Sequence, residues 1–161
     1  GAVLMNAGAY NFETKNVVFK KFNSKKDETD MELCIDFAIS LGTNEIVILG
    51  AIGTRIDHTL TNINLLMKAE DANVKAVIVD NNNEIQIISN NITITGKKGD
   101  LVSLIPISTY VEGIDTTGLE YPLKNATMTI GKSLGVSNVM TSNLATVNIK
   151  SGYLLVIKAK D

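Results

Sequence analysis

Residues 45–58 read EIVILGAIGTRIDH, and this stretch decides how the first half of the chain folds. Glu45–Leu49 is a short apolar run typical of a buried strand. The loop Gly50–Gly53 then turns the chain, and a helical stretch and a second apolar run, Val74–Val79, follow it. The apolar face of that helix is formed by Leu60, Ile63, Leu66 and Met67. This order predicts a βαβ unit on a parallel sheet.

The same alternation extends upstream of this stretch. Val17–Phe22 is a predicted strand, and a helix follows it with Gly42 as a plausible end. Its apolar face comprises Met31, Cys34, Ile35, Ala38 and Ile39. After the polar turn Asp80–Asn83, Glu84–Ser89 could be a final strand of this sheet or a bridge out of it. Residues 1–89 are therefore predicted to form a partial parallel, Rossmann-like α/β domain.

The second half of the chain has a different pattern. Beyond about Asn90 the helical period disappears, and short β-rich pieces follow at intervals marked by glycine turns. These pieces are Ile92–Thr95, Leu101–Ile105, Thr127–Ile130, Ala145–Ile149 and Tyr153–Ile157. Pro106 and Pro122 are expected at strand edges or in loops. Residues 90–161 are predicted to form an all-β sandwich or barrel.

Composition restricts the partners and the compartment. The 17 acidic and 15 basic residues give a net charge of -2 and are interspersed, which argues against a general nucleic-acid binder. The apolar run Ile46–Ile52 is far shorter than the ~20 residues needed to cross a bilayer. No signal peptide opens the chain, and its single cysteine can form no internal disulfide. We expect a cytoplasmic protein without nucleic-acid or membrane partners.

Acidic residues gather before the first predicted helix, in the run Lys26-Asp27-Glu28-Thr29-Asp30. Thr29 and Glu32 have the spacing of a capping box, and acids in a first helical turn are favoured by the helix dipole, so capping alone explains the run. Alternatively, Asp27 and Asp30 direct two carboxylates into the crevice at the carboxyl ends of parallel strands. Such oxygen ligands would suit magnesium on a nucleotide.

The loop after Leu49 carries groups suited to phosphate. Gly50 and Gly53 let main-chain N–H groups approach an anion, and the helix start adds a favourable dipole. Arg55 offers a planar fork that can hold a phosphate through two hydrogen bonds. Asp57 adds a carboxylate at the same sheet edge. His58, the only histidine, could donate to a phosphate or equally could cap or orient the helix.

Taken together, these residues indicate phosphoryl-transfer chemistry. Asp27, Asp30 and Asp57 with Arg55 would cluster at two successive strand ends and would fit a magnesium-bound polyphosphate. Asn62 lies one helical turn further on and shares the same face. This pattern indicates the class of reaction but does not identify the acceptor of the phosphoryl group.

The motifs resemble those of one enzyme family, the thiamin pyrophosphokinases. On the nucleotide side the similar stretches are Asp27-x-Thr29-Asp30 and Gly50-x-x-Gly53-x-Arg55-x-Asp57-His58. In the second half they are Gly99-Asp100-x-Val102-Ser103-Leu104-Ile105-Pro106, Thr117-Gly118-Leu119-x-Tyr121-Pro122-Leu123 and Ser133-x-Gly135-x-Ser137-Asn138. The resemblance covers the chain from about Val17 onward, in the family's order.

The resemblance implies a transferase, a kinase that moves diphosphate from ATP, bound with Mg²⁺, to thiamin and releases AMP. It implies a homodimer in which an α/β nucleotide domain and a β-sandwich domain build the site, with thiamin at the subunit interface. The catalytic and metal residues carried over are Asp27, Asp30, Arg55, Asp57 and His58, with the three aspartates on the metal. ATP-side neighbours are Thr29, Gly50, Gly53 and Asn62. Thiamin-side residues are Ser133, Ser137 and Asn138, with Tyr121 as a stacking candidate.

One departure from the family concerns the N-terminal segment. The family carries an acidic Gly-Asp-x-Asp-Ser-type motif upstream of these strands, and residues 1–26 contain no such sequence. We therefore expect either a fragment lacking that segment or a member without the full chemistry. Two alternatives stay open: a related diphosphokinase acting on a hydroxymethylpterin, and a truncated module that binds thiamin or nucleotide without turnover.

Overall fold

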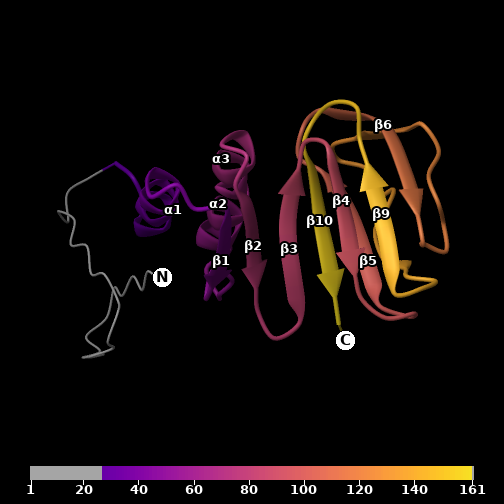
Figure 1. The fold of residues 1–161 in the computed structure, drawn as a ribbon, viewed down its shortest axis with the longest axis horizontal. Coiled ribbons are helices and arrows are strands. Elements are labelled where there is room, and N and C mark those ends of the chain that lie inside the picture. Colours follow the sequence, from indigo (N-terminus) through magenta and orange to yellow (C-terminus); the bar gives the residue numbers. More distant parts are fainter. Residues whose placement is uncertain (1–26, 161) are drawn as a thin grey trace.

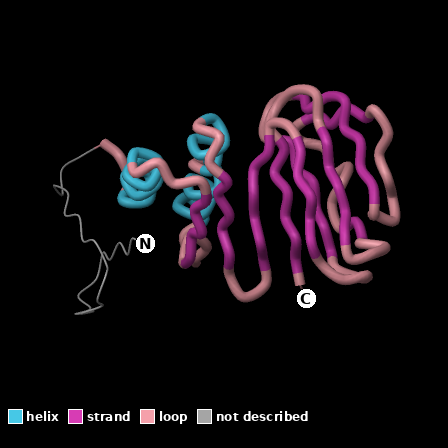
Figure 2. Tube along the Cα trace, in the orientation of Figure 1, coloured by secondary structure: helices cyan, strands magenta, loops and turns pink. Residues whose placement is uncertain are grey.

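The computed structural model describes residues 27–160 (Figures 1 and 2), so the predicted strand Val17–Phe22 lies outside the described residues. Three helices are present in the described part: α1 (Asp30–Ser40), α2 (Ile56–Asn64) and α3 (Leu66–Asp71). Figure 1 shows them gathered at one end of the molecule, beside β1 and β2, while strands make up the rest. No helix within residues 27–160 has the length and apolar character to cross a membrane.

A six-stranded mixed sheet runs through both halves of the chain, in the order β1-β2-β3-β10-β5-β8. Its strands are β1 (Glu45–Leu49), β2 (Lys75–Val79), β3 (Asn83–Ile88), β5 (Leu101–Pro106), β8 (Asn138–Val139) and β10 (Leu154–Ala159). Only β1 and β2 pair in parallel, and the other neighbours are antiparallel. The predicted βαβ unit is therefore confirmed at this end of the sheet.

A second sheet has four strands in the order β4-β9-β6-β7, all antiparallel. They are β4 (Asn91–Thr95), β6 (Tyr110–Thr117), β7 (Ala126–Thr129) and β9 (Leu144–Asn148). One buried apolar cluster joins this sheet to β5 and β10 of the larger one, through residues such as Leu104, Val147 and Leu154. A separate cluster lies beneath the helices, where Ile35, Leu66 and Ile78 are fully buried.

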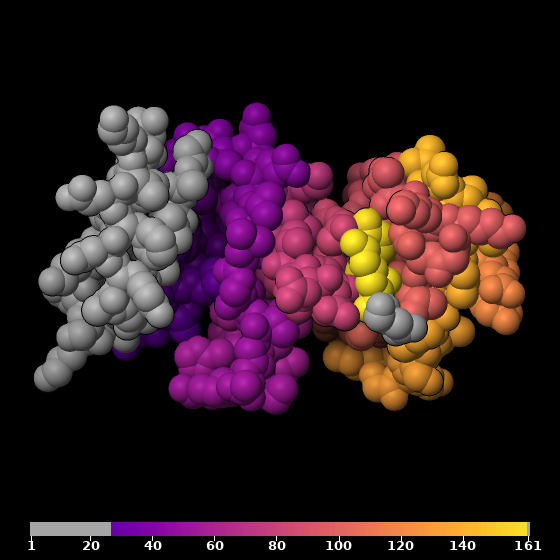
Figure 3. All heavy atoms as spheres, turned by 90° about the horizontal axis from the view of Figure 1, so that it is seen from below, coloured from indigo at the N-terminus to yellow at the C-terminus, as the bar shows by residue number. Residues whose placement is uncertain are grey.

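The strand β3 links the two halves. Ile85 pairs with Ile78 of β2 and with Ile157 of β10, so β3 is a further strand of the same sheet and also connects the βαβ unit to the second half. Seen from below, the C-terminal end of the chain, in yellow, emerges between the two halves (Figure 3). The division at Asn90 stays a prediction, and continuous main-chain hydrogen bonding crosses it.

The helix boundaries follow the sequence signals only in part. Thr29 caps α1, because its hydroxyl accepts the Glu32 N–H at 3.2 Å. Gly42 ends that helix, with its N–H donating to the Ile39 carbonyl at 2.9 Å. The second helix was predicted as one piece, which is wrong: it breaks at Leu65 into α2 and α3. Leu60 is exposed, and α2 buries no residue completely.

The predicted strands that fall within residues 27–160 are found within a residue or two, whereas β6 and β8 were missed. The strand β6 contains Gly113, and its pairing with β7 shifts register between Val111 and Ile114, which marks a β-bulge. A glycine and a bulge interrupt the alternation by which strands are recognised. The strand β8 has only two residues and presents no pattern at all.

Two glycines with nearly equal φ values provide a test of the packing around the second sheet. Gly42 and Gly118 have φ values of +70° and +71°, so alanine at either position is strained. A Cβ at Gly42 would meet nothing, whereas at Gly118 it would collide with the Leu144 carbonyl oxygen. We expect G42A to lower the free energy of unfolding by about 1 kcal/mol and G118A to lower it by roughly 2 kcal/mol more. Urea denaturation of both variants measures the difference, and equal losses would contradict the close β6–β9 approach.

Candidate functional site

The glycine loop leaves the carboxyl end of β1 and enters α2. Gly50 follows Leu49 with a φ of +72°, and Arg55 is the N-cap residue of α2. The loop is held from the helix: the Asn62 side chain donates from Nδ2 to the Ala51 carbonyl at 2.8 Å. The α2 N-terminus thus lies directly after the loop, as the sequence predicts for an anion site.

Thr59 is a site residue that the sequence analysis did not find. Its Oγ1 accepts the Gly53 N–H at 3.2 Å and lies 3.4 Å from the Gly53 carbonyl oxygen. The predicted anion-binding N–H of Gly53 is therefore already used inside the protein. A threonine in a first helical turn gives little signal in the sequence, since many such residues only contact the helix main chain.

Arg55 and Asp57 form a bidentate ion pair at the start of α2. Arg55 Nε donates to Asp57 Oδ1 at 3.2 Å, and Nη2 donates to Oδ2 at 2.6 Å. Both side chains are largely exposed, at 68% and 65%. The Arg55 hydrogen bond, together with the His58 main-chain N–H, lowers the pKa of Asp57 to about 2. The carboxylate is thus ionised throughout the physiological range. His58 lies in the same turn and is exposed.

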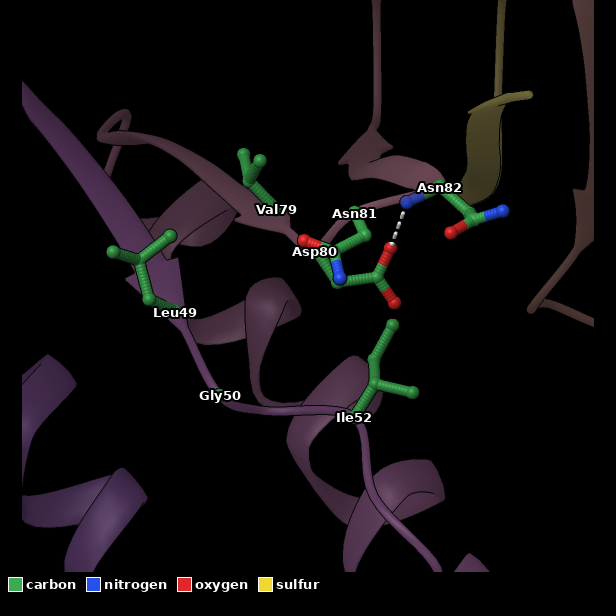
Figure 4. Close-up of a pocket in the computed structure, with 7 residues that line it drawn as sticks. All are labelled: Leu49, Gly50, Ile52, Val79, Asp80, Asn81 and Asn82. Atoms are coloured by element: carbon green, nitrogen blue, oxygen red, sulfur yellow. Dashed lines mark hydrogen bonds between the residues drawn. The ribbon is translucent and has the colours of Figure 1, made fainter.

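An open hollow of about 640 Å³ lies beside this loop, at the carboxyl ends of β1 and β2 (Figure 4). One wall is formed by Leu49, Gly50 and Ile52. The opposite wall is the end of β2 and its turn, formed by Val79, Asp80, Asn81 and Asn82. The sequence indicated a crevice at this edge, and a hollow of this size can receive a small organic ligand.

The remaining predicted acids lie at the start of α1. Asp27 and Asp30 are exposed there, on either side of the capping residue Thr29. Across residues 27–160 no three histidine, cysteine, aspartate or glutamate side chains come close enough to hold a metal ion. The assignment of Asp27, Asp30 and Asp57 to magnesium therefore stays a prediction, without support from the geometry. Capping fully accounts for the position of Thr29.

The predicted thiamin-side residues lie around β8. Ser133 and Ser137 are exposed, and Ser137 has a φ of +58° with its N–H donating to Ser103 Oγ at 3.0 Å. Asn138 is buried, with 6% of its surface exposed. Its Oδ1 accepts the Tyr121 N–H at 3.0 Å and the Val139 N–H at 2.9 Å, while Nδ2 donates to the Tyr121 carbonyl at 2.8 Å. Asn138 thus fixes the main chain that carries the exposed ring of Tyr121.

Two family models match the chain one after the other. The catalytic domain of thiamin pyrophosphokinase matches residues 5–78, and the vitamin B1 binding domain of thiamin pyrophosphokinase matches residues 83–154. The chain belongs to the thiamin pyrophosphokinase family. Its glycine loop, Arg55, Asp57 and the α1 acids lie in the part matched by the catalytic domain, and Ser133 to Asn138 lie in the part matched by the vitamin B1 binding domain.

Individual members of the family agree with this assignment. The chain is 33% identical over 142 residues to the thiamine pyrophosphokinase of Bacillus subtilis, and 30% identical over 146 residues to thiamine pyrophosphokinase 2 of Arabidopsis thaliana. These matches span 87% and 84% of this chain, but 66% and 54% of the relatives. The chain therefore spans less than two thirds of the length of these relatives.

Solved structures of the family have the same fold. The crystal structure of thiamine pyrophosphokinase from Bacillus subtilis superposes with a TM-score of 0.81 at 34% identity, covering 86% of this chain and 65% of that one. The thiamin pyrophosphokinase of Geobacillus thermodenitrificans gives a TM-score of 0.78 at 33% identity, covering 86% and 64%. The mixed α/β architecture is thus a property of the family.

The pKa of Asp57 tests the Arg55–Asp57 pair directly. In R55A the two hydrogen bonds from Arg55 to the carboxylate are lost and that from the His58 N–H remains, so we expect this pKa to rise from about 2 toward the ordinary value of about 3.9. Carboxyl ¹³C NMR during an acid titration measures it. Because the folded-state pKa is the lower one, the pair favours the folded state above about pH 4, and this effect disappears as the pH falls toward 2.

The carboxyl group of Asp80 is the internal control for this titration. Its pKa is lowered by N–H groups of its own turn, chiefly that of Asn82, and owes nothing to Arg55. We expect its titration to be unchanged in R55A. A pKa of Asp57 that stays in place in R55A would show that the two side chains are not paired in solution.

Proposed function

We propose that this chain carries out, or supplies the principal part of, the thiamin pyrophosphokinase reaction, the transfer of diphosphate from ATP to thiamin. The observation that carries the proposal is the tandem match to a catalytic domain followed by a vitamin B1 binding domain of that family. The match to a vitamin B1 domain favours thiamin over a hydroxymethylpterin as the acceptor. In this proposal a Rossmann-like part binds ATP and a β-sandwich part binds thiamin.

The polyphosphate of ATP would lie over the glycine loop and the N-terminus of α2. Arg55 has five N–H donors, and Asp57 occupies one on Nε and one on Nη2, which leaves the others for phosphate oxygens. Asp57 holds the planar guanidinium in one orientation, so less side-chain freedom is lost when the phosphate binds. Asn62 and Thr59 keep the loop in place beneath it. His58 is exposed at the same turn and available to the polyphosphate.

Thiamin would bind near β8. The hydroxyls of Ser133 and Ser137 are exposed and suit hydrogen bonds to an aminopyrimidine. Asn138 would act mainly by positioning, because its amide already holds both the N–H and the carbonyl of Tyr121. The Tyr121 ring, 68% exposed, would then offer an aromatic face to the ligand.

In the proposed reaction the hydroxyl oxygen of thiamin attacks the β-phosphorus of ATP. The bond between the β-phosphorus and the oxygen bridging to the α-phosphate breaks, AMP leaves with that oxygen, and the hydroxyl proton passes to a base. The protein chiefly aligns the two groups and neutralises charge, for which Arg55 is suited. Magnesium bound with ATP belongs to this proposal, and no step is derived through it. A homodimer with thiamin at the interface and a cytoplasmic location complete the proposal.

Release of AMP from magnesium-ATP, with and without thiamin, tests this function. We expect thiamin-dependent AMP, and in R55A a fall in kcat/KM for ATP of about 100-fold with little change in thiamin binding. K124A is a matched control, because Lys124 is an exposed cation paired with Asp115 at 3.1 Å and lies in the other half of the chain.

The other outcomes separate the alternatives. Thiamin binding without AMP release would favour a non-catalytic module, and AMP release with hydroxymethylpterin but not thiamin would favour the related diphosphokinase. Equal losses of ATP use and thiamin binding in R55A would contradict the role given to Arg55.

A further inference from the structure

The turn after β2 forms one wall of the hollow and has no role in the function described so far. Asp80 begins it, and its Oδ1 accepts the N–H groups of Asn82 at 2.8 Å and Asn83 at 2.6 Å. The Asn83 side chain adds a third donor to Oδ1 at 3.1 Å and a longer contact of 3.3 Å to Oδ2. The carboxylate is thus fixed by the main chain, with one oxygen fully used and the other nearly free.

The free oxygen faces the hollow. Figure 4 shows one carboxylate oxygen of Asp80 bonded to the Asn82 N–H and the other directed across toward Ile52. Within residues 27–160 no lysine, arginine or histidine forms an ion pair with Asp80, in contrast to Asp57, which Arg55 occupies. An ionised carboxylate oxygen in this position is an acceptor for hydroxyl or amino groups of a ligand and repels phosphate.

The rest of the hollow suits a flat, partly apolar group. Leu49 has 72% of its surface exposed although it ends a strand, and it lines the hollow together with Ile52 and Val79. A ligand that covers these side chains would remove apolar surface from water. The hollow therefore combines apolar side chains on both walls with an acceptor on the Asp80 turn, and its glycine loop leads to the N-terminus of α2.

The arrangement of these features is analogous to that in dinucleotide-binding Rossmann folds. In Rossmann folds that bind NAD, a glycine loop after the first strand holds the phosphates, and an acid about 20 residues further along the chain binds a ribose hydroxyl. Here the loop follows β1, Asp80 follows β2, and β1 pairs in parallel with β2 with Leu49 opposite Val79. Asp80 is thus at the ribose position when phosphate lies on the loop.

We propose that Asp80 binds the ribose hydroxyls of ATP, with the base against Leu49, Ile52 and Val79. This inference rests on the proposed function for the identity of the nucleotide. It makes Asp80 a residue that selects ribonucleotides over deoxyribonucleotides and takes no part in the transfer itself.

Calorimetric binding of ATP and of 2′,3′-dideoxyATP to the wild type and to D80N tests the proposal. Asparagine keeps an Oδ1 for the turn and replaces only the second oxygen, so the turn is retained. We expect the wild type to bind ATP at least about 10-fold more tightly than the dideoxy compound, since a hydrogen bond to a charged group has this effect. In D80N that ratio falls to about 2-fold or less, with dideoxyATP affinity unchanged.

D115N is the matched control. Asp115 also accepts a main-chain N–H, that of Asn125 at 3.1 Å, and lies in β6, away from the hollow. We expect D115N to keep the wild-type preference for ATP. Thermal melting of both variants checks folding, and the Asp80 carboxyl ¹³C signal of the wild type gives a second measurement: it should shift on adding ATP and much less on adding dideoxyATP.

The outcomes separate this inference from the proposed function. Equal wild-type affinities for ATP and dideoxyATP, or a full preference for ATP in D80N, would overturn the role of Asp80 even if thiamin-dependent AMP release is observed. A ribose preference lost in D80N would support it even if no AMP is released. Absence of any ATP binding by the folded wild type would overturn it as well.

Discussion

The parallel pairing of β1 with β2 is the constraint on which the candidate site depends. Because Leu49 lies opposite Val79 in this register, the two strands end side by side. The glycine loop and the Asp80 turn therefore leave the sheet at the same edge, and the hollow lies between them. No other pair of neighbouring strands in the larger sheet is parallel, so this edge is the one place in the described sheet where two strand ends of this kind meet.

The extension of the same sheet through β3 and β10 couples this edge to the rest of the molecule. Two acidic residues of α3 bond to this sheet. Glu70 accepts both the N–H and the hydroxyl of Ser89, and Asp71 accepts the hydroxyl of Tyr153. These contacts tie α3 to the end of β3 at Ser89 and to the start of β10 at Tyr153. In the proposed reaction, such rigidity would help to align the two substrates.

Patterns local in the sequence were sufficient for most of the fold. Alternation and apolar runs located strands such as β1, and Thr29 and Gly42 marked the ends of α1 because caps depend on residues only a few positions apart. The strand β6 was missed because Gly113 and the bulge interrupt its alternation, and the break at Leu65 was missed because the helical period continues across it. Leu60 is exposed although the helical period placed it on the apolar face.

For the candidate site too, the sequence predicted some features and not others. The types of residue at the loop, Gly50, Arg55 and Asp57, predicted an anion site at this edge, where the structure places a hollow. Side-chain partners could not be predicted in the same way. Asn62 bonds to Ala51, and Asn138 bonds to Tyr121, across gaps that no local pattern spans. In the sequence Asp80 is only part of a polar turn. The sheet register is needed to show that this turn forms the wall of the hollow opposite the glycine loop.

Amide chemical-shift mapping of the labelled chain with ATP tests the central claim most directly, because it locates the nucleotide without requiring turnover. The account predicts that the largest changes fall on the glycine loop, the first turn of α2 and the Asp80 turn. Changes concentrated on another surface, such as the four-stranded sheet, with these segments unaffected, would contradict it.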